Sequence, residues 1–88
     1  MTVRWSRRAL SDAAGIYAYV AADNAEAAAR VAGRLYAAGE NLGRFPLAGR
    51  ASRFAGRREL SVDQYVLTYS IRRGEVHILA LEHSARRK

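Results

Sequence analysis

The residues of this chain that could do chemistry lie mostly in its C-terminal half. Glu82 and His83 are an adjacent carboxylate and imidazole, the one such pair in the sequence. Metal-independent cleavage of RNA needs a base for the ribose 2′-hydroxyl, an acid for the leaving oxygen and cations for the phosphate. Arg58, Arg72 and Arg86 could supply the cations as forked donors. The sequence therefore nominally holds the parts of a ribonuclease site.

Each of these residues also has a structural interpretation. Neighbours on a strand point to opposite faces, so Glu82 and His83 share a site only if their strand ends before them. A histidine after a terminal strand also suits a capping or partner-contact role. Arg58 suits an ion pair with Glu59 or Asp63 as well as it suits a phosphate. For His83 and for Arg58, the functional and the structural interpretation both stay open.

The tyrosines and the basic residues at the C-terminal end also have a structural and a functional interpretation. Tyr65 and Tyr69 alternate with Leu67 and Ile71, which favours core aromatics with outward hydroxyls over base stacking. The basic run at residues 86–88 fits a solvated tail, and its charge also suits nucleic acid or an acidic protein segment.

Composition limits the classes of protein that the chain can belong to. Its 88 residues, half of them apolar, allow one modest core, so we expect a single domain over residues 1–88. There is no cysteine, which excludes a disulfide framework and a thiolate metal site. No zinc, P-loop or nucleophile-elbow pattern occurs, and we expect neither a metal nor another cofactor. The N-terminus does not resemble a signal peptide and no run reaches about 18 apolar residues, so we expect a cytoplasmic protein.

The positive charge is distributed unevenly along the chain. The net charge is +7, and residues 46–88 carry nine basic and four acidic side chains against six and four in residues 1–45. Residues 44–58 hold five arginines and no carboxylate. A GC-rich genome would explain the preference for arginine over lysine but not this placement. The excess favours acidic partners.

Periodicity predicts a short strand and a helix at the N-terminal end. Residues 2–6 alternate as a strand does. Ser6 is suited to cap a helix that begins at Arg7 or Arg8. The predicted apolar stripe of this helix consists of Leu10, Ala13, Tyr17 and Val20.

A second helix follows directly and makes a helical hairpin with the first. Asp23 and Glu26 match a capping box at its start, and Pro46 lies beyond its end. Small residues on both helices, Gly15 and Gly33 among them, predict a close approach of the two axes. The apolar seam of the second helix consists of Ala28, Val31, Leu35, Ala38, Leu42 and Phe45.

Beyond a loop that extends to Gly56, the period falls to two and predicts three more strands. Arg73 and Gly74 supply a turn before the last strand, in which Val76, Ile78 and Ala80 alternate against His77, Leu79 and Leu81. The predicted order is β-α-α-β-β-β. We therefore expect an α+β fold in which the helical hairpin packs on an antiparallel four-stranded sheet.

These segments, in this order, resemble the RelE/ParE superfamily of toxins, and ParE more than RelE. The resemblance covers almost the whole chain. Family members often carry arginine where Ala80 stands and an apolar residue where Glu82 stands. The segments that carry the resemblance are Tyr17-Ala18-Tyr19-Val20-Ala21, Asp23-Asn24-Ala25-Glu26-Ala27-Ala28, Leu42-Gly43-Arg44-Phe45-Pro46-Leu47-Ala48-Gly49-Arg50, Gly56-Arg57-Arg58-Glu59-Leu60, Tyr65-Val66-Leu67-Thr68-Tyr69 and Ile78-Leu79-Ala80-Leu81-Glu82-His83-Ser84-Ala85-Arg86.

The resemblance implies the toxin of a type II toxin–antitoxin system, which arrests growth until a cognate antitoxin neutralises it. ParE-like members poison DNA gyrase, whereas RelE-like members cut messenger RNA on the ribosome. The long hairpin and the incomplete catalytic set favour gyrase, with no enzymatic activity of the toxin itself. A RelE-like endoribonuclease using His83, Arg58, Arg72 and Arg86 is the alternative, and a basic domain without toxicity is the third possibility.

The apolar stripe also predicts where the antitoxin docks. It exceeds what a short hairpin can bury on four strands, so we expect part of it to form the docking groove for an acidic antitoxin segment. The expected antitoxin-binding residues are Val31, Leu35, Leu42, Phe45, Tyr65 and Tyr69.

Overall fold

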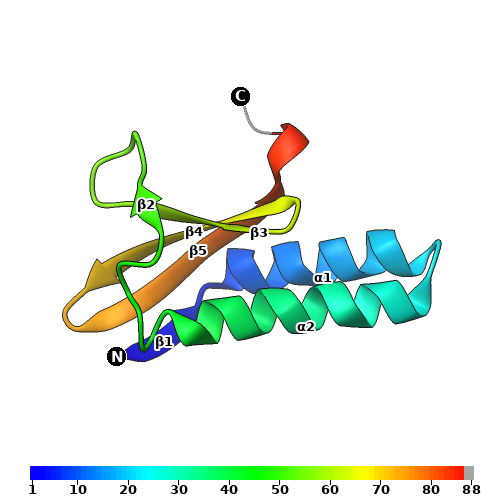
Figure 1. Cartoon of the computed structure of the whole chain (residues 1–88), viewed down its shortest axis with the longest axis horizontal. Helices are drawn as coiled ribbons and strands as arrows, with labels where there is room; N and C mark the ends of the chain where they lie inside the picture. The colour runs from blue at the N-terminus through cyan, green and yellow to red at the C-terminus, as the bar shows by residue number, and fades with distance from the viewer. Residues whose placement is uncertain (87–88) are drawn as a thin grey trace.

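The elements follow one another in the order β-α-α-β-β-β-β (Figure 1). The computed structural model describes residues 1–86, so the last two residues of the predicted basic tail lie outside the described residues. The elements are β1 Thr2–Trp5, α1 Arg7–Ala21, α2 Ala25–Asn41, β2 Arg50–Ala51, β3 Arg58–Val62, β4 Tyr65–Arg72, β5 Glu75–His83 and a 3-10 turn, η1, at Ser84–Arg86.

Helix α1 begins as predicted, but it turns a different side to the sheet. The Ser6 hydroxyl caps it by accepting a hydrogen bond from the Ala9 amide at 3.0 Å. Ala13 of the predicted stripe packs against the core, but Leu10 and Tyr17 are 56% and 43% exposed. Ala9, which is fully buried, and Ile16 face the core instead. Alanines occur on several sides of α1, so its periodicity indicates a helix without fixing which side is buried.

Helix α2 is capped by Asn24, and the predicted Asp23–Glu26 capping box is wrong. The Asn24 side chain accepts a hydrogen bond from the Ala27 amide at 3.0 Å. Asp and Asn are about equally good N-caps, so two neighbouring candidates cannot be ranked by type. The predicted seam is buried at Ala28, Leu35 and Leu42, while Phe45 lies beyond the helix and is 54% exposed.

The predicted close approach at Gly15 and Gly33 is also wrong. A Cβ at either position would have no atom within 4 Å. The tight contact is at Gly39 instead, where a Cβ would overlap the Trp5 indole and the end of the Ile78 side chain. Gly39 therefore lets the last turns of α2 lie directly on β1 and β5.

The sheet has five strands, in the order β1-β5-β4-β3-β2. The β3-β4-β5 meander is antiparallel as predicted. The prediction of a four-stranded antiparallel sheet is wrong in two respects, because β2 adds a two-residue edge strand and β1 pairs in parallel with β5. Two residues are too few to show a period, and no local pattern reports a pairing between the two ends of the chain.

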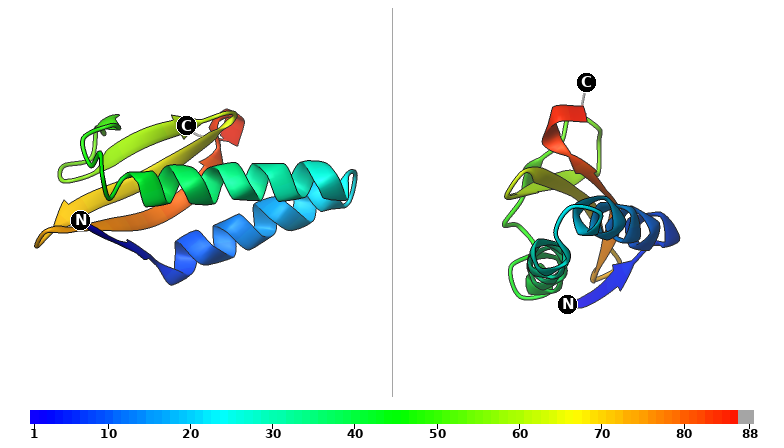
Figure 2. Two further views of the ribbon diagram at one scale, coloured as in Figure 1. Left: turned by 60° about the horizontal axis from the view of Figure 1, so that its bottom comes forward. Right: turned by 90° about the vertical axis from the view of Figure 1, so that its right-hand side faces the viewer.

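Both helices pack on one face of this sheet, and the tip of the hairpin projects past its edge (Figures 1 and 2). The loop that carries β2 and the η1 turn stand on the other side. Leu35 and Leu42 of α2 share one buried cluster with Leu67, Tyr69 and Ile78 of the sheet. Within residues 1–86, no helix has the length and apolar character needed to cross a membrane.

A β-bulge in β5 decides which way the end of this strand points. The register with β4 shifts between Thr68 and Tyr69 and leaves Leu79 as an extra residue. The predicted alternation therefore fails after Leu79. Leu81 is 3% exposed and joins the core on the helix side, and Ala80 does not.

Side chains from the start of α1 satisfy the backbone at this bulge. The Ser6 hydroxyl donates to the Leu79 carbonyl at 3.0 Å, and the Leu81 amide donates to Asp12 Oδ2 at 3.0 Å. Leaving such a buried group unpaired costs about 1–3 kcal/mol. The bulge is thereby fixed, and with it the direction of the residues that follow.

Candidate functional site

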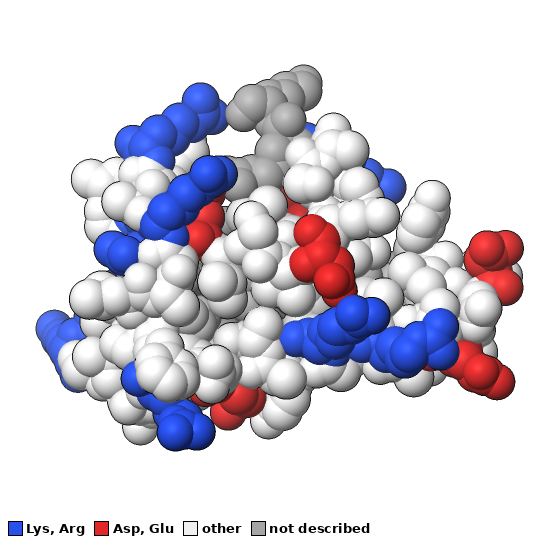
Figure 3. All heavy atoms as spheres, in the orientation of Figure 1, with Lys and Arg blue, Asp and Glu red and all other residues white. Residues whose placement is uncertain are grey.

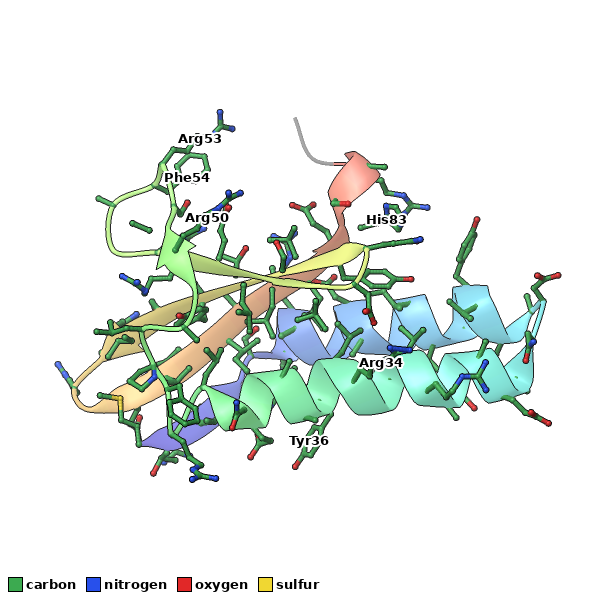
Figure 4. All side chains as sticks on the ribbon, in the orientation of Figure 1. Arg34, Tyr36, Arg50, Arg53, Phe54 and His83 are labelled. Atoms are coloured by element: carbon green, nitrogen blue, oxygen red, sulfur yellow. The ribbon has the colours of Figure 1, made fainter. Side chains whose placement is uncertain are left out.

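A groove of about 460 Å³ lies between α1 and the end of β5, and we call it the His83 groove. Because of the bulge, His83 pairs with Tyr65 across the strands and lies on the helix side of the sheet. Its labelled side chain stands beside η1 in Figure 4. The polar and aromatic residues that line the groove are Arg8, Ser11, Asp12, Tyr19, Tyr65, Glu82, His83 and Arg86.

Both ring nitrogens of His83 have partners. Nδ1 accepts a hydrogen bond from the Ala85 amide at 3.1 Å, and Nε2 lies 3.2 Å from Gln64 Oε1. A neutral ring with its proton on Nε2 satisfies both contacts at once. The Tyr65 ring packs edge-on against the imidazole, with the centroids 5.4 Å apart. His83 thus fastens the turn after β5 to the turn before β4.

Ile16 and Leu81 make part of the groove apolar, and its charged side chains Asp12, Arg8 and Arg86 have contacts of their own. Asp12 receives the Leu81 amide and lies 3.6 Å from Arg8 Nε. The Arg86 guanidinium lies 6.0 Å from the centroid of the Tyr19 ring. This arrangement could bind an anion or an aromatic group at its mouth.

The four candidate catalytic residues do not come together. His83 and Arg86 share the groove, but Arg72 is exposed at the far end of β4. Arg72 lies seven positions along the strand from Tyr65, the neighbour of His83, which is about 23 Å at ~3.3 Å per residue. Arg58 lies on another strand and donates from Nη2 to the Gly49 carbonyl at 2.6 Å.

Glu82 and His83 are separated as the strand geometry requires. Strand β5 continues through His83, so the two side chains leave the strand on opposite faces. Glu82 pairs with Val66 and His83 with Tyr65 in the register of β4. Both residues line the His83 groove, but they leave the strand in opposite directions, so they are not a preformed acid–base pair.

Three of the six expected antitoxin-binding residues are not accessible. Leu35, Leu42 and Tyr69 are at most 2% exposed, because the helices bury them against the sheet. Val31 and Tyr65 are half-buried beside the core, and Phe45 is exposed. The predicted docking groove is wrong for the three buried residues, because the stripe fits within the chain's own core.

Tyr69 is a core residue that holds a surface loop in place. It is fully buried, and its hydroxyl donates to the Pro46 carbonyl at 2.7 Å and accepts from the Gly49 amide at 2.9 Å. The prediction of a core tyrosine is confirmed, but the hydroxyl anchors a loop rather than facing solvent. A Cβ on Gly49 would lie 2.6 Å from the Glu59 carbonyl oxygen, so only glycine fits at this anchor.

The segment held by this anchor is strongly basic, and we call residues 50–58 the arginine loop. It holds four arginines and no carboxylate. Phe54 near its tip is 54% exposed, with the Arg53 guanidinium 4.9 Å from the ring centroid. Figure 4 shows Arg50, Arg53 and Phe54 projecting from the end of the molecule opposite to His83. The sequence signal for this surface was the run of arginines, whereas the exposure of Phe54 was not foreseen.

Comparison with known proteins agrees with this architecture. Residues 3–88 match the family model described as the ParE toxin of the type II toxin–antitoxin system, parDE. The chain belongs to the ParE toxin family. It is therefore the toxin of a type II toxin–antitoxin system, and a toxin of this kind has a cognate antitoxin as partner.

Two individual proteins are similar to this ParE-family toxin, one in sequence and one in structure. It is 37% identical over 84 residues to "Toxin RelE2" of Caulobacter vibrioides, with 96% of each chain covered. The solved structure described as "Chromosomal ParDE TA system from P. aeruginosa" superposes with a TM-score of 0.82 at 25% identity, covering 94% of this chain and 95% of that one. The RelE and ParE names both occur among its relatives, so the names leave the target open.

Proposed function

We propose that this toxin arrests bacterial growth in the cytoplasm by poisoning DNA gyrase, and that its antitoxin prevents this. The toxin acts by binding: it stabilises the state of gyrase in which DNA is cut, and it carries out no catalysis itself. A plasmid or chromosomal locus encoding such a pair is stably kept, because cells that lose the antitoxin are left with the toxin.

The observation that carries the proposal is the dispersal of the candidate catalytic residues. Base, acid and phosphate-binding groups must lie within hydrogen-bond reach of one bound nucleotide. Here Arg72 and Arg58 lie far from His83, and both nitrogens of His83 already have partners. A toxin without an assembled acid–base site is better suited to act by binding than by hydrolysis.

The helical hairpin supports the same proposal. Its helices of 15 and 17 residues project past the sheet and expose Tyr19 and Tyr36 at 74% and 61%. Tyr36 stacks on Trp5 with the rings 12° from parallel, and the Trp5 indole donates to Glu40 at 2.8 Å. A rigid rod with exposed aromatic side chains suits protein–protein recognition.

A supercoiling assay tests the proposal. Purified toxin added to gyrase, ATP and relaxed plasmid should reduce the supercoiled product and increase cleaved plasmid after protein denaturation. The doubly substituted His83→Ala/Arg86→Ala variant should inhibit as the unsubstituted chain does, and prior addition of antitoxin should abolish inhibition. Normal supercoiling at a large molar excess of folded toxin would contradict the proposal.

One observation favours the endoribonuclease alternative, namely that His83, Arg86 and Arg8 share a groove. In that case translating ribosomes supplied with the toxin would yield codon-positioned cuts in messenger RNA. His83→Ala/Arg86→Ala would abolish the cuts, and gyrase would stay fully active. The same variant thus gives opposite results under the two candidate functions.

A further inference from the structure

Two residues of the arginine loop, Arg57 and Arg58, carry positive charge that no carboxylate of residues 1–86 neutralises. Arg57 is exposed, and Arg58 donates to the carbonyl oxygens of Gly49 and Leu47 at 2.6 and 3.5 Å. Within residues 1–86 neither arginine forms an ion pair with a carboxylate. Arg50 does approach Glu59, at 3.6 Å, but its own side chain is 78% exposed. The Glu59 side chain is 10% exposed, so this pair offsets the charge of Arg50, and the positive field of the loop comes from Arg57 and Arg58.

A hollow of about 380 Å³ lies inside this positive field. It is lined by Arg57 and Arg58 together with Ser52, Phe54 and Gly56, and the described residues place no carboxylate in it. Arg58 Nε is buried beneath it and has no acceptor within the described part of the chain, so the exposed donors are those of Arg57 and Ser52. Figure 3 shows basic side chains gathered over the loop that carries β2, at the upper left. Guanidinium groups and a serine hydroxyl around a small hollow are donors that phosphate oxygens accept from.

The loop also offers a flat apolar surface beside these donors. The Phe54 ring is 54% exposed and lines the hollow next to Arg57 and Arg58. The Arg53 guanidinium covers one side of the ring at 4.9 Å. Guanidinium–aromatic pairs of this kind are common where unpaired bases stack on a protein.

Hydrogen bonds fix the shape of the loop in advance. The Phe54 amide donates to Ser52 Oγ at 3.1 Å, and the Ser52 amide donates to the Arg57 carbonyl at 2.9 Å. Gly56 takes a φ of +77°, which closes the turn. A preformed loop loses less conformational entropy when it binds than a flexible one does.

We propose that the arginine loop binds the phosphodiester backbone of single-stranded nucleic acid, with a base stacked on Phe54. The arginines hold phosphates without reading sequence, and the ring requires a base that is not paired. An acidic protein segment would satisfy the charges but would make no use of the ring. The inference goes beyond the proposed function, and its test contains neither gyrase nor ribosomes, so either can fail without the other.

Fluorescence anisotropy with a labelled oligothymidylate tests the proposal on the full chain. Affinity should fall as salt rises, with a logarithmic slope that decreases by about 0.7 for each phosphate contact removed. Phe54→Leu should weaken binding about tenfold, since it keeps an apolar side chain but removes the stacking surface. Arg57→Gln should weaken binding and lower the salt slope.

Arg30→Gln on the exposed side of α2 is the matched control, because it removes the same charge far from the loop. It should leave the affinity within about twofold, as expected if the contacts and not the net charge decide binding. Circular dichroism melts check that all three variants are folded.

Three results would overturn the proposal. The first is no binding at low salt, and the second is an equal loss of affinity in Arg30→Gln and Arg57→Gln. The third is unchanged binding in Phe54→Leu together with full competition by polyglutamate, which would instead identify the loop as a surface for an acidic protein.

Discussion

The His83 groove and the arginine loop lie toward opposite ends of the same sheet and use their polar side chains in opposite ways (Figure 4). In the groove, His83 contacts Gln64 and Ala85, and Asp12 holds Arg8 and the Leu81 amide. In the loop, Arg57 and Arg58 have no carboxylate partner within residues 1–86.

The residue types that could do chemistry lie in the groove, where they hold the fold together, whereas the loop has side chains that remain available to a partner. Imidazole and carboxylate in the groove are used to join α1, β5 and the turn before β4. In the loop, backbone carbonyls hold Arg58, and neither Arg58 nor Arg57 forms an ion pair with a carboxylate of residues 1–86. In this protein, arginines without a carboxylate partner on a preformed loop therefore indicate a binding surface better than the presence of a catalytic residue type does.

The largest expected effect comes from changing the anchor of the arginine loop. Gly49→Ala places a Cβ about 2.6 Å from the Glu59 carbonyl oxygen and 2.8 Å from the Tyr69 ring. Backbone and a fully buried ring cannot move aside, so we expect a loss of about 3 kcal/mol of stability. Thermal unfolding should show a melting temperature lower by roughly 15 °C.

The same substitution at the groove is the control. Gly15→Ala lies on α1 at the His83 groove, where a Cβ has no atom within 4 Å. Alanine is the better helix former by up to about 1 kcal/mol, so this variant should be more stable than the unsubstituted chain. If Gly15→Ala lowered the stability as much as Gly49→Ala does, the groove would be packed as tightly as the anchor of the arginine loop.

The next largest effect distinguishes two tyrosines of β4. Tyr69→Phe removes both hydrogen bonds that hold Pro46 and Gly49, and leaves buried partners unpaired. We expect a loss of about 2 kcal/mol and faster amide exchange at Gly49, measured by chemical denaturation and hydrogen exchange.

Tyr65→Phe is the matched change at the groove. It keeps the ring that packs edge-on against His83, so its expected cost is below about 0.5 kcal/mol. A cost as large as that of Tyr69→Phe would mean that the groove, too, is anchored through a buried hydroxyl.

Local patterns predicted most of the fold, and the predictions that were wrong share one cause. Ser6 as N-cap, the hairpin of strands around Arg73 and the seam at Leu35 and Leu42 all follow from short-range periodicity and turn chemistry. The parallel pairing of β1 with β5 and the bulge at Leu79 depend on contacts between distant segments. Such contacts leave no periodic trace in the sequence.

The candidate site was less predictable for the same reason. One bulge residue shifts the register of β5, so it decides that His83 pairs with Tyr65 and Glu82 with Val66. Three of the residues assigned to the antitoxin, Leu35, Leu42 and Tyr69, are buried because small residues let the helices lie close to the sheet, as at the contact of Gly39 with Trp5. Residue types indicated the possible chemistry, but their distances depended on register, which composition does not contain.

The smallest effect is expected from His83 itself. His83→Ala removes one contact to the Ala85 amide and one to the Gln64 side chain, both of them exposed interactions. Water can replace both partners, so the expected loss of stability is below about 1 kcal/mol, measured by thermal unfolding. Amide exchange at Ala85 should accelerate while exchange at Leu67 in the core stays unchanged. Growth arrest by the induced variant should match that of the unsubstituted toxin, because a fastening residue can be lost without loss of target binding. If the folded variant instead failed to arrest growth, the groove would be the working surface and its paired side chains would be the ones that meet the target.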